Sequence, residues 1–359
     1  MKTKIKRIVI LTFVVFTLTF FTKSVRTQLK EETAGRKFKN IKVLNEMPAE
    51  QMGKVMNMMS ASLGVNCNFC HAEDDFAKDG NEHKDIARDM LKMTFELNKN
   101  YFESRPEINC NTCHQGRPHP SNGFPLSPNF REPRPVQPEK KPSVEEILAK
   151  YETALGGKIN LSKINSREIK AQRLEPDGKT FEAETIWQKG NKLSVQTVYP
   201  SKEYGDYIVK EIFDGAAARK FGNNSEIKLK PDEAEAIRRE AELFAKPNIQ
   251  KIYTELKFSR LEKIDGREVY SLDAKSNSDQ TERLYFDVRT GLLVRRTAST
   301  QTVLGNHVFQ VDYQDYKNFG GVNLPTITKF AVPQIYWTRK ILAVKNNAAI
   351  DETKFTSLK

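Results

Sequence analysis

Cys67-Asn68-Phe69-Cys70-His71 and Cys110-Asn111-Thr112-Cys113-His114 are two copies of one pattern, Cys-x-x-Cys-His. This pattern is the attachment signature of c-type haem, in which two cysteines form thioethers with the haem vinyl groups and the histidine binds the iron. The chain has four cysteines, and the two motifs use all of them. The sequence therefore predicts two covalently bound haem c groups, with His71 and His114 as axial ligands.

Two other uses of paired cysteines fit the spacing less well. Zinc ribbons usually separate their cysteine pairs by about 15–20 residues, whereas 39 residues lie between Cys70 and Cys110. Two disulfides, or a thioredoxin-like redox pair, would need neither of the histidines that follow the pairs. Haem attachment is therefore the preferred interpretation, with zinc and disulfides as the alternatives.

The N-terminus indicates export. Four basic residues precede an apolar run from Ile8 to Phe21, which is 14 residues long. Such a run is typical of an export signal and is short for a membrane span. No clear small-x-small cleavage site follows it, so residues 1–30 are predicted to be either a signal peptide or an N-terminal anchor. Because c-type haem is attached outside the cytoplasm in bacteria, we expect the protein in the periplasm or on the outer face of the bacterial inner membrane.

The net charge of +12 is unevenly distributed. Counted as Lys plus Arg minus Asp and Glu, residues 1–40 carry +8, residues 41–120 carry −3, residues 121–150 carry +1 and residues 151–359 carry +6. Nucleic-acid binding would gather Lys and Arg with aromatic residues on one face, and the sequence shows no such cluster. We therefore expect a solvated charged surface and no nucleic-acid partner.

Methionines gather around the first motif. Apart from Met1, all seven lie between residues 47 and 93. A general gap-filling role in protein cores would scatter them along the chain, whereas a thioether sulfur is also a ligand of haem iron. The distribution favours methionine as the second axial ligand of each haem.

Two helices are predicted to carry these methionines. The first has an apolar face and is expected to end at Gly64, so that the chain can reverse and present Met56 or Met59 opposite His71. The second runs from about residue 82 to residue 102 and ends before a proline that forbids continuation. Its apolar stripe consists of Ile86, Met90, Met93 and Leu97.

The histidine count supports this ligand set. Beyond the two motif histidines, only His83, His119 and His307 remain. The first lies near a helix start, the second follows the second motif closely, and the third lies in the other domain, in a predicted turn. Because none is well placed, Met/His ligation is favoured over bis-histidine ligation, and it raises the reduction potential.

The length of 359 residues predicts more than one domain. Residues 117–142 contain eight of the sixteen prolines, so residues 121–142 are predicted to be a semi-rigid connector. It joins a di-haem cytochrome c domain at residues 40–120 to a C-terminal domain at residues 143–359.

The C-terminal domain is predicted to be α+β. It opens with a helix capped by Ser143 in a capping-box pattern, and a charged helix from Pro231 to Phe244 interrupts the strands that follow. The strand-like runs are residues 181–188, 192–198, 207–213, 256–263, 267–272, 281–288, 292–298, 308–316 and 326–332. The fold class expected is thus multidomain, an α-helical di-haem domain followed by a large curled antiparallel sheet, or half-barrel.

Residues 52–119 resemble one di-haem half of the tetra-haem cytochrome c subunit of photosynthetic reaction centres. The resemblance is carried by residues 56–71, by residues 87–98 and by Cys110-Asn-Thr-Cys-His-Gln-Gly116. It implies that Met56, eleven residues before Cys67, and Met90, on the helix between the haems, are the second axial ligands. Met59 and Met93, one turn away, are the alternatives.

The chain also departs from that family, because it has two haem sites rather than four and no helices for binding chlorophyll or a reaction centre. Residues 143–345 resemble the lipoprotein-carrier fold, the LolA/LolB-like half-barrel. That resemblance is carried by residues 155–157, 212–215 and 320–325. In that fold a curled sheet can hold an acyl chain, so the resemblance implies a lipid as a partner of the C-terminal domain.

The sequence as a whole predicts an exported di-haem c-type cytochrome that carries single electrons in a respiratory or photosynthetic-type chain and is not an enzyme. Its expected partner is a redox protein, either a soluble cytochrome or a membrane complex, with membrane association through the N-terminal segment. One alternative is a di-haem peroxidase-like enzyme, which would need an exchangeable iron ligand and distal acid–base groups. Another is a lipid- or lipoprotein-binding protein with an accessory haem domain.

Overall fold

The computed structural model describes residues 32–72, 75–120, 137–179, 181–223, 225–245, 249–275 and 281–356. The predicted signal or anchor at residues 1–30 and most of the predicted proline-rich connector lie outside the described residues. Within the described ranges, no helix is both long and apolar enough to span a membrane.

Residues 32–49 close on themselves as a small loop. Helix α2 spans Ala34–Lys37, and a β-bridge joins Thr33 to Pro48. The backbone N–H of Ala34 donates to the carbonyl oxygen of Met47 at 2.7 Å. Both of these apolar residues are buried, so the start and the end of the loop are joined by hydrogen bonds and by apolar packing.

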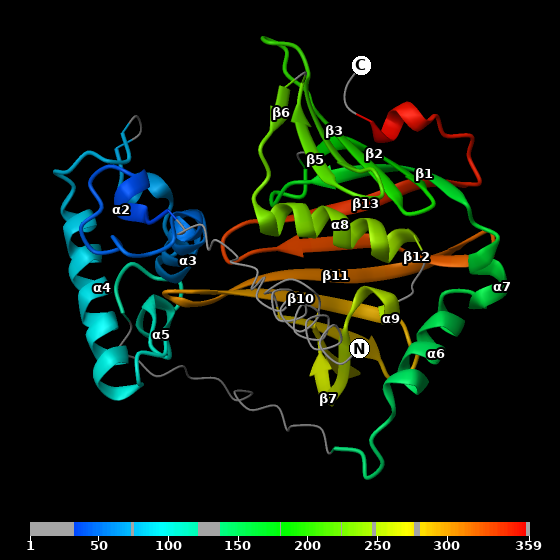
Figure 1. The fold of residues 1–359 in the computed structure, drawn as a ribbon, viewed down its shortest axis with the longest axis horizontal. Coiled ribbons are helices and arrows are strands. Elements are labelled where there is room, and N and C mark those ends of the chain that lie inside the picture. Colours follow the sequence, from blue (N-terminus) through cyan, green and yellow to red (C-terminus); the bar gives the residue numbers. More distant parts are fainter. Residues whose placement is uncertain are drawn as a thin grey trace, which may run out of the picture. The chain divides into compact units, whose positions relative to one another are not determined.

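Three helices and a 3-10 turn form the part of the chain that contains the motifs. They are α3 (Met52–Leu63), η2 (Cys67–Phe69), α4 (Glu82–Tyr101) and α5 (Cys110–His114), preceded by η1 (Ala49–Gln51). Helix α3 packs against α5, and α5 also contacts α4 (Figure 1). The two long helices predicted from the methionine pattern are confirmed, and the second ends one residue earlier than expected.

The rest of the described chain is built on one antiparallel sheet of thirteen strands. Their order is β6-β5-β4-β3-β2-β1-β13-β12-β11-β10-β9-β8-β7. The bounds are β1 (Ser166–Leu174), β2 (Phe181–Lys189), β3 (Lys192–Tyr199), β4 (Tyr207–Phe213), β5 (Ala218–Gly222), β6 (Ser225–Ile227), β7 (Glu255–Ile264), β8 (Arg267–Lys275), β9 (Thr281–Asp287), β10 (Leu293–Thr302), β11 (Gly305–Phe319), β12 (Val322–Ala331) and β13 (Tyr336–Asn346). The chain runs from β1 outward to β6 at one edge, continues at the opposite edge with β7, and runs inward to β13, which pairs with β1 and joins the two halves of the sheet.

Helices cover one face of this sheet. Helix α6 (Val144–Ala154) is followed by the short α7 (Gly157–Ser162), and α8 (Pro231–Ala245) precedes α9 (Ile249–Ile252). As the sequence predicted, Ser143 caps α6 in a capping box with Glu146. Figure 1 shows α8 lying across the strands, where Ile237 and Ala241 pack on side chains of β1 to β4.

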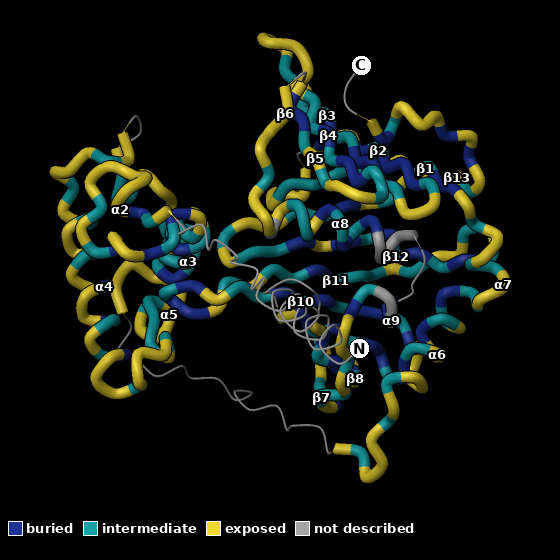
Figure 2. The backbone as a smooth tube through the Cα atoms, in the orientation of Figure 1, coloured by how far each residue is buried: buried dark blue, intermediate teal, exposed yellow. Residues whose placement is uncertain are grey.

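The core therefore lies between the sheet and these helices. Tyr151 of α6 and Leu155, the C-cap of that helix, pack with Leu272 and Phe286 of the sheet. On the other face, Trp187 packs with apolar residues of the C-terminal segment, which contains η3 (Glu352–Phe355). Figure 2 shows the buried residues concentrated along the strands. The predicted fold class, helices followed by a large antiparallel sheet, is confirmed.

Two details of the prediction need correction. The strands β1, β5, β6 and β13 were not expected, because their buried and exposed positions do not alternate cleanly. The segment around His307 is not a turn: it lies in β11, and the hairpin turn is one step earlier, at Val303 and Leu304. Thr302 pairs with Gly305 across that two-residue turn.

Candidate haem-binding sites

The first motif begins immediately after a chain reversal. Gly64 caps α3 in the left-handed conformation, with φ of 65°, a region that glycine enters without steric cost. The backbone N–H of His71 donates to the carbonyl oxygen of Cys67 at 3.0 Å. The five residues of the motif thus form one compact turn, which holds both sulfur atoms and the imidazole on a short length of backbone.

The imidazole of His71 is held by a backbone carbonyl. Its Nδ1 atom lies 3.0 Å from the carbonyl oxygen of Phe76, and the two rings meet edge to face with centroids 5.2 Å apart. When the ring proton is on Nδ1, this nitrogen donates to the carbonyl and Nε2 carries the lone pair that can bind a metal. The contact therefore selects the tautomer and the ring orientation that an axial ligand needs.

The second motif repeats this arrangement. It forms α5, which is capped by Asn109 in a capping box with Thr112. The Nδ1 atom of His114 lies 3.0 Å from the carbonyl oxygen of Arg117. Both motif histidines are thus held through Nδ1 by a carbonyl that follows the motif, and this contact leaves the Nε2 lone pair of each ring available to bind a metal.

Helix α4 begins beside the first motif. The side chain of Asn81 accepts a hydrogen bond from the backbone N–H of His83 at 2.9 Å and donates to the carbonyl oxygen of Phe69 at 3.1 Å. The ring of His83 stacks on that of Phe69, with centroids 4.1 Å apart. One asparagine therefore caps the helix and ties its start to the motif.

The other end of α4 is joined to the approach to the second motif. Asn98 is buried, and its side chain both donates to and accepts from the backbone of Ile108. The carbonyl oxygen of Ser62, near the end of α3, accepts from the backbone N–H of Gly116 at 2.8 Å. Both ends of the second motif are thus attached to the long helices.

The expected methionine ligands lie on α3 and α4 as predicted. Met56 and Met59 are partly buried on α3. On α4, Ile86, Met90 and Met93 lie at i, i+4 and i+7, and they are 53%, 38% and 44% exposed. An apolar stripe of this kind is unusual on the surface of a folded domain and fits contact with a flat apolar group such as a haem.

The structure describes all four cysteines and joins none of them in a disulfide; two are exposed and two are partly buried. Burial raises the pKa of the Cys70 and Cys110 thiols above the ordinary value. In the described part of the chain, no group of three or more His, Cys, Asp and Glu side chains is arranged to hold a metal ion. A single zinc site would need the two cysteine pairs to form such a group.

Sequence reasoning found the motif residues but missed the groups that position them. The carbonyls of Phe76 and Arg117 carry no sequence signal, because every residue has one. Asn98 did leave a signal, since asparagine is a poor helix former at an interior position and its presence there suggests a side-chain contact. Asn81, at the expected start of the second helix, is a typical capping residue.

Comparison with known proteins agrees with the motifs. Residues 19–149 match the sequence model of the photosynthetic reaction centre cytochrome C subunit. Cytochrome c-554 of Chloroflexus aurantiacus is 33% identical over 91 residues, which cover 24% of this chain and 22% of that protein. The photosynthetic reaction center cytochrome c subunit of Roseobacter denitrificans is 31% identical over 101 residues, which cover 25% of this chain and 27% of that protein. The chain thus spans about a quarter of the length of these curated relatives.

Solved structures that resemble the chain have lower sequence identity to it. A LolA superfamily protein from Nitrosomonas europaea aligns over 60% of this chain and 98% of its own, with 16% identity and a TM-score of 0.42. A DUF1329 family protein from Desulfovibrio piger aligns over 58% of this chain and 97% of its own, with 11% identity and a TM-score of 0.36. Over residues 19–149, this chain is similar in sequence to the photosynthetic reaction centre cytochrome c subunit family, and the resemblance predicted from its two Cys-x-x-Cys-His motifs is confirmed for that part of the chain.

Proposed function

We propose that this chain is an exported di-haem c-type cytochrome that carries single electrons in a respiratory or photosynthetic-type chain. Sequence similarity to reaction-centre cytochromes supports the general role, haem-based electron transfer. The proposed organisation is a signal or anchor at residues 1–30, a di-haem domain at residues 40–120, a connector at residues 121–142 and a sheet domain at residues 143–359.

The proposed ligands are one histidine and one methionine for each iron. Cys67 and Cys70 would attach the first haem and the cysteines of α5 the second. Nε2 of His71 would face Met56, and Nε2 of His114 would face Met90. Bound haem supplies a one-electron iron couple, and methionine opposite histidine keeps its potential higher than a second histidine would.

The observation that carries this proposal is the matched contact of the two motif histidines. Each Nδ1 lies 3.0 Å from a backbone carbonyl oxygen just beyond its motif, that of Phe76 in the first and Arg117 in the second. Such a partner fixes the orientation of a ligating imidazole and increases its basicity. Cysteine pairs that form disulfides or react as thiols would not require a carbonyl that orients the neighbouring histidine.

A sulfur ligand on the second side of each iron would leave no position for a substrate. We therefore propose an electron carrier rather than a peroxidase-like enzyme. The proposed redox partner is a soluble cytochrome or a membrane complex outside the cytoplasm, reached from the periplasm or from the outer face of the inner membrane through the N-terminal segment. For the C-terminal domain we propose a lipid-like ligand, because its sheet and helices enclose a cavity among apolar side chains.

Haem counting tests the proposal. Purified protein from a host that matures c-type cytochromes is expected to give two haems per chain in a pyridine haemochrome assay, and an intact mass that carries both covalently. Cys67→Ser with Cys70→Ser should retain one haem, and so should Cys110→Ser with Cys113→Ser. One haem or none in the unmodified chain contradicts the proposal. Rapid binding of carbon monoxide to either reduced iron would favour the peroxidase-like alternative.

A further inference from the structure

The C-terminal domain contains a cavity of about 260 Å³. It lies between the sheet and the helices α6, α7 and α8, and much of its wall is apolar. The apolar lining includes Leu155, Leu161, Ile164, Val311, Val322 and Leu324. The volume is just below the range of roughly 300–1,000 Å³ that holds drug-sized molecules, so the cavity suits a single small occupant.

Most charged groups in the cavity wall have a partner of opposite charge. Arg339 pairs with Glu184 at 2.5 Å and also with Glu240, and Arg296 pairs with Glu282 at 3.2 Å. Lys220, the lysine that lines the cavity, also forms an ion pair, because its Nζ atom lies 2.7 Å from a carboxylate oxygen of Glu211. Each of these three cations therefore has at least one carboxylate beside it.

Arg167 differs from these groups. It lies in β1, is only 4% exposed, and lines the cavity. Its Nε donates to the side-chain oxygen of Asn346 at 3.0 Å, and one terminal nitrogen lies 3.4 Å from the side-chain oxygen of Gln188. Both partners are its cross-strand neighbours in the sheet, and both are neutral amides. No ion pair of the described residues includes Arg167, and burial alone lowers its pKa to about 10.

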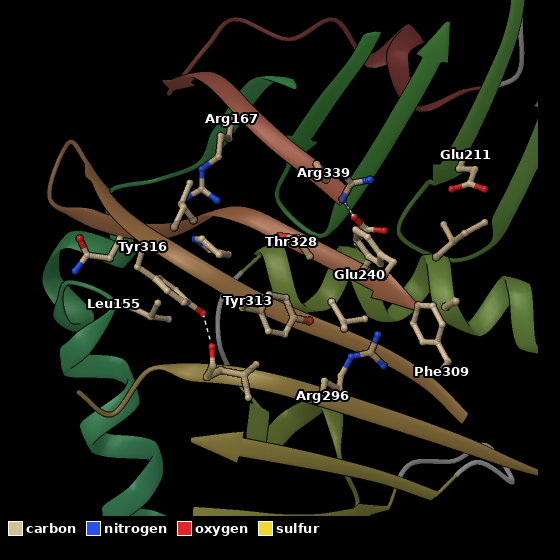
Figure 3. A pocket seen from close by; sticks show the side chains of 18 of the residues that line it. Leu155, Arg167, Glu211, Glu240, Arg296, Phe309, Tyr313, Tyr316, Thr328 and Arg339 are labelled. Carbon is tan, nitrogen blue, oxygen red and sulfur yellow. Dashed lines mark hydrogen bonds and ion pairs between the residues drawn. The ribbon is translucent and has the colours of Figure 1, made fainter. Parts of the chain in front are cut away.

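The position of this guanidinium is well determined by its neighbours. The side-chain nitrogen of Asn346 donates to the carbonyl oxygen of Phe319 at 2.8 Å, so its oxygen faces Arg167. Figure 3 shows Arg167 on the side of the cavity where Leu155 and Tyr316 also lie, with Glu211 on the opposite side. The hydroxyl of Tyr316 is occupied, because it donates to the carbonyl oxygen of Leu293 at 2.7 Å.

A buried cation without a carboxylate partner is costly, because it has lost its water and gained no opposite charge. A guanidinium has five N–H donors, and the two amide oxygens accept from only two of them. The remaining donors form the edge that matches the two oxygens of a carboxylate. The arrangement therefore has the charge and the donors for an anion, next to apolar walls.

We propose that this cavity binds a small amphipathic monocarboxylate, with the carboxylate on Arg167 and the apolar body along the side chains of α6, α7, β11 and β12. A monoanion balances the charge of Arg167, for which the described residues supply no carboxylate partner. A phosphate monoester carries between one and two negative charges at neutral pH, and the excess would lie in a wall that already contains Glu240 and Glu211. This inference gives a ligand class to the ligand role proposed for the C-terminal domain, and it does not depend on the haems.

Calorimetric titration of the full-length haem-loaded protein with octanoate, octanol and octyl phosphate tests the proposal. Octanoate is expected to bind with one site per chain, octanol at least about tenfold more weakly, and octyl phosphate more weakly than octanoate, because one charge-assisted bidentate contact corresponds to a factor of this size. Equal binding of octanoate and octanol would overturn the role of Arg167, and tighter binding of octyl phosphate would overturn the choice of a carboxylate.

Two variants make the test specific. Arg167→Gln removes the charge and keeps an amide that its neighbours can bond, and it should weaken octanoate binding by about tenfold or more. Lys170→Gln makes the same charge change three residues along β1, where strand alternation turns the side chain to the other face, and should leave binding unchanged. Loss of octanoate binding in both variants, or in neither, contradicts the proposal.

A further measurement covers the case in which Arg167→Gln does not fold. Octanoate should raise the thermal unfolding midpoint of the unmodified protein, and octanol should raise it less, because a ligand that binds only the folded state stabilises it. No shift with octanoate overturns the proposal without any variant. A haemochrome assay on the same sample measures the haem content independently of octanoate binding. Failure of the carboxylate proposal can therefore be distinguished from failure of the electron-carrier proposal.

Discussion

Asn98 and Ile108 exchange two hydrogen bonds across ten residues of chain. The side-chain nitrogen of Asn98 donates to the carbonyl oxygen of Ile108 at 2.7 Å, and its side-chain oxygen accepts from the Ile108 backbone N–H at 2.9 Å. Asn98 is 5% exposed, so both bonds are shielded from water. This pair connects the last turns of α4 to the residue two places before Cys110, and it holds the second motif on the helix that precedes it.

Replacement of this asparagine is expected to destabilise the second motif. Asn98→Leu removes both hydrogen bonds and leaves two backbone groups of Ile108 without partners, which should lower the free energy of unfolding by about 2–4 kcal/mol. Urea unfolding followed by circular dichroism measures the change. Asn100→Ala, on an exposed position of the same helix, is the control and should stay within about 0.5 kcal/mol of the unmodified protein. A similar value for both variants would show that the pair does not support the fold.

The chain reversal before the first motif should require glycine. Gly64 has φ of 65°, and an added Cβ would lie 2.2 Å from the carbonyl oxygen of Gly116. Gly64→Ala is therefore expected to cost at least about 2 kcal/mol, from the left-handed backbone and from separation of α3 and α5. Gly53→Ala, in the first turn of α3, would bring its Cβ no closer than 3.8 Å to another atom and should stabilise by roughly 0.4–1 kcal/mol. The opposite order of the two stabilities would be incompatible with this geometry.

Exchange of the proposed axial methionines should change the potentials one at a time. Met56→His and Met90→His are each expected to lower one of two reduction potentials, because bis-histidine ligation stabilises the oxidised iron more than Met/His ligation does. The change should be a fraction of the roughly 0.8 V range that axial ligands span. Each variant should also lose one sulfur-to-iron charge-transfer band from the oxidised spectrum. Spectropotentiometry measures both quantities.

Controls for this exchange are available on the same helices. Met58→His on α3 and Lys92→His on α4 introduce the same side chain two residues away, on a different side of each helix, and should leave both potentials unchanged. If Met59→His or Met93→His lowers a potential and the proposed variants do not, the axial ligand is one turn further along. Unchanged spectra in all of these variants would reject methionine ligation.

The buried ion pairs of the sheet domain make a separate prediction. Arg339→Leu leaves Glu184 without the guanidinium that lies 2.5 Å away and also removes the partner of Glu240. The uncompensated buried carboxylate of Glu184 should lower the free energy of unfolding by about 3–5 kcal/mol. Lys340→Leu, at the exposed neighbouring position, removes a charge of the same sign and should change the free energy of unfolding little. Chemical unfolding at neutral pH compares the two, and equal values would mean that solvent reaches the Glu184 site.

Much of the helical part could be predicted because its signals are local. Helix α3 was predicted from apolar residues at helical spacing and a glycine at its end, and the structure places that end at Gly64. Ser143 was predicted to cap α6 from a serine followed three residues later by Glu146, and the capping box is present. In each case the deciding contacts join residues no more than a few positions apart.

The sheet was predicted less completely for the opposite reason. Strand β13 has no regular alternation of buried and exposed residues, and it pairs with β1 across a large separation in sequence. Arg167 and Asn346, which bond across that pair, are 179 residues apart. Strand pairing at such a distance depends on the whole fold, so the local pattern of either strand could not predict it.

The sequence by itself determined the two haem motifs, the helices that carry the methionines and the cap of α6, because each depends on residue type and short spacing along one segment. Only the tertiary structure decided which backbone carbonyls hold His71 and His114, that Gly64 lies against Gly116, and that the charge of Arg167 lies in a cavity without a carboxylate beside it. These relationships depend on where separate segments meet. That meeting is set by burial of apolar surface and pairing of buried polar groups across the whole chain.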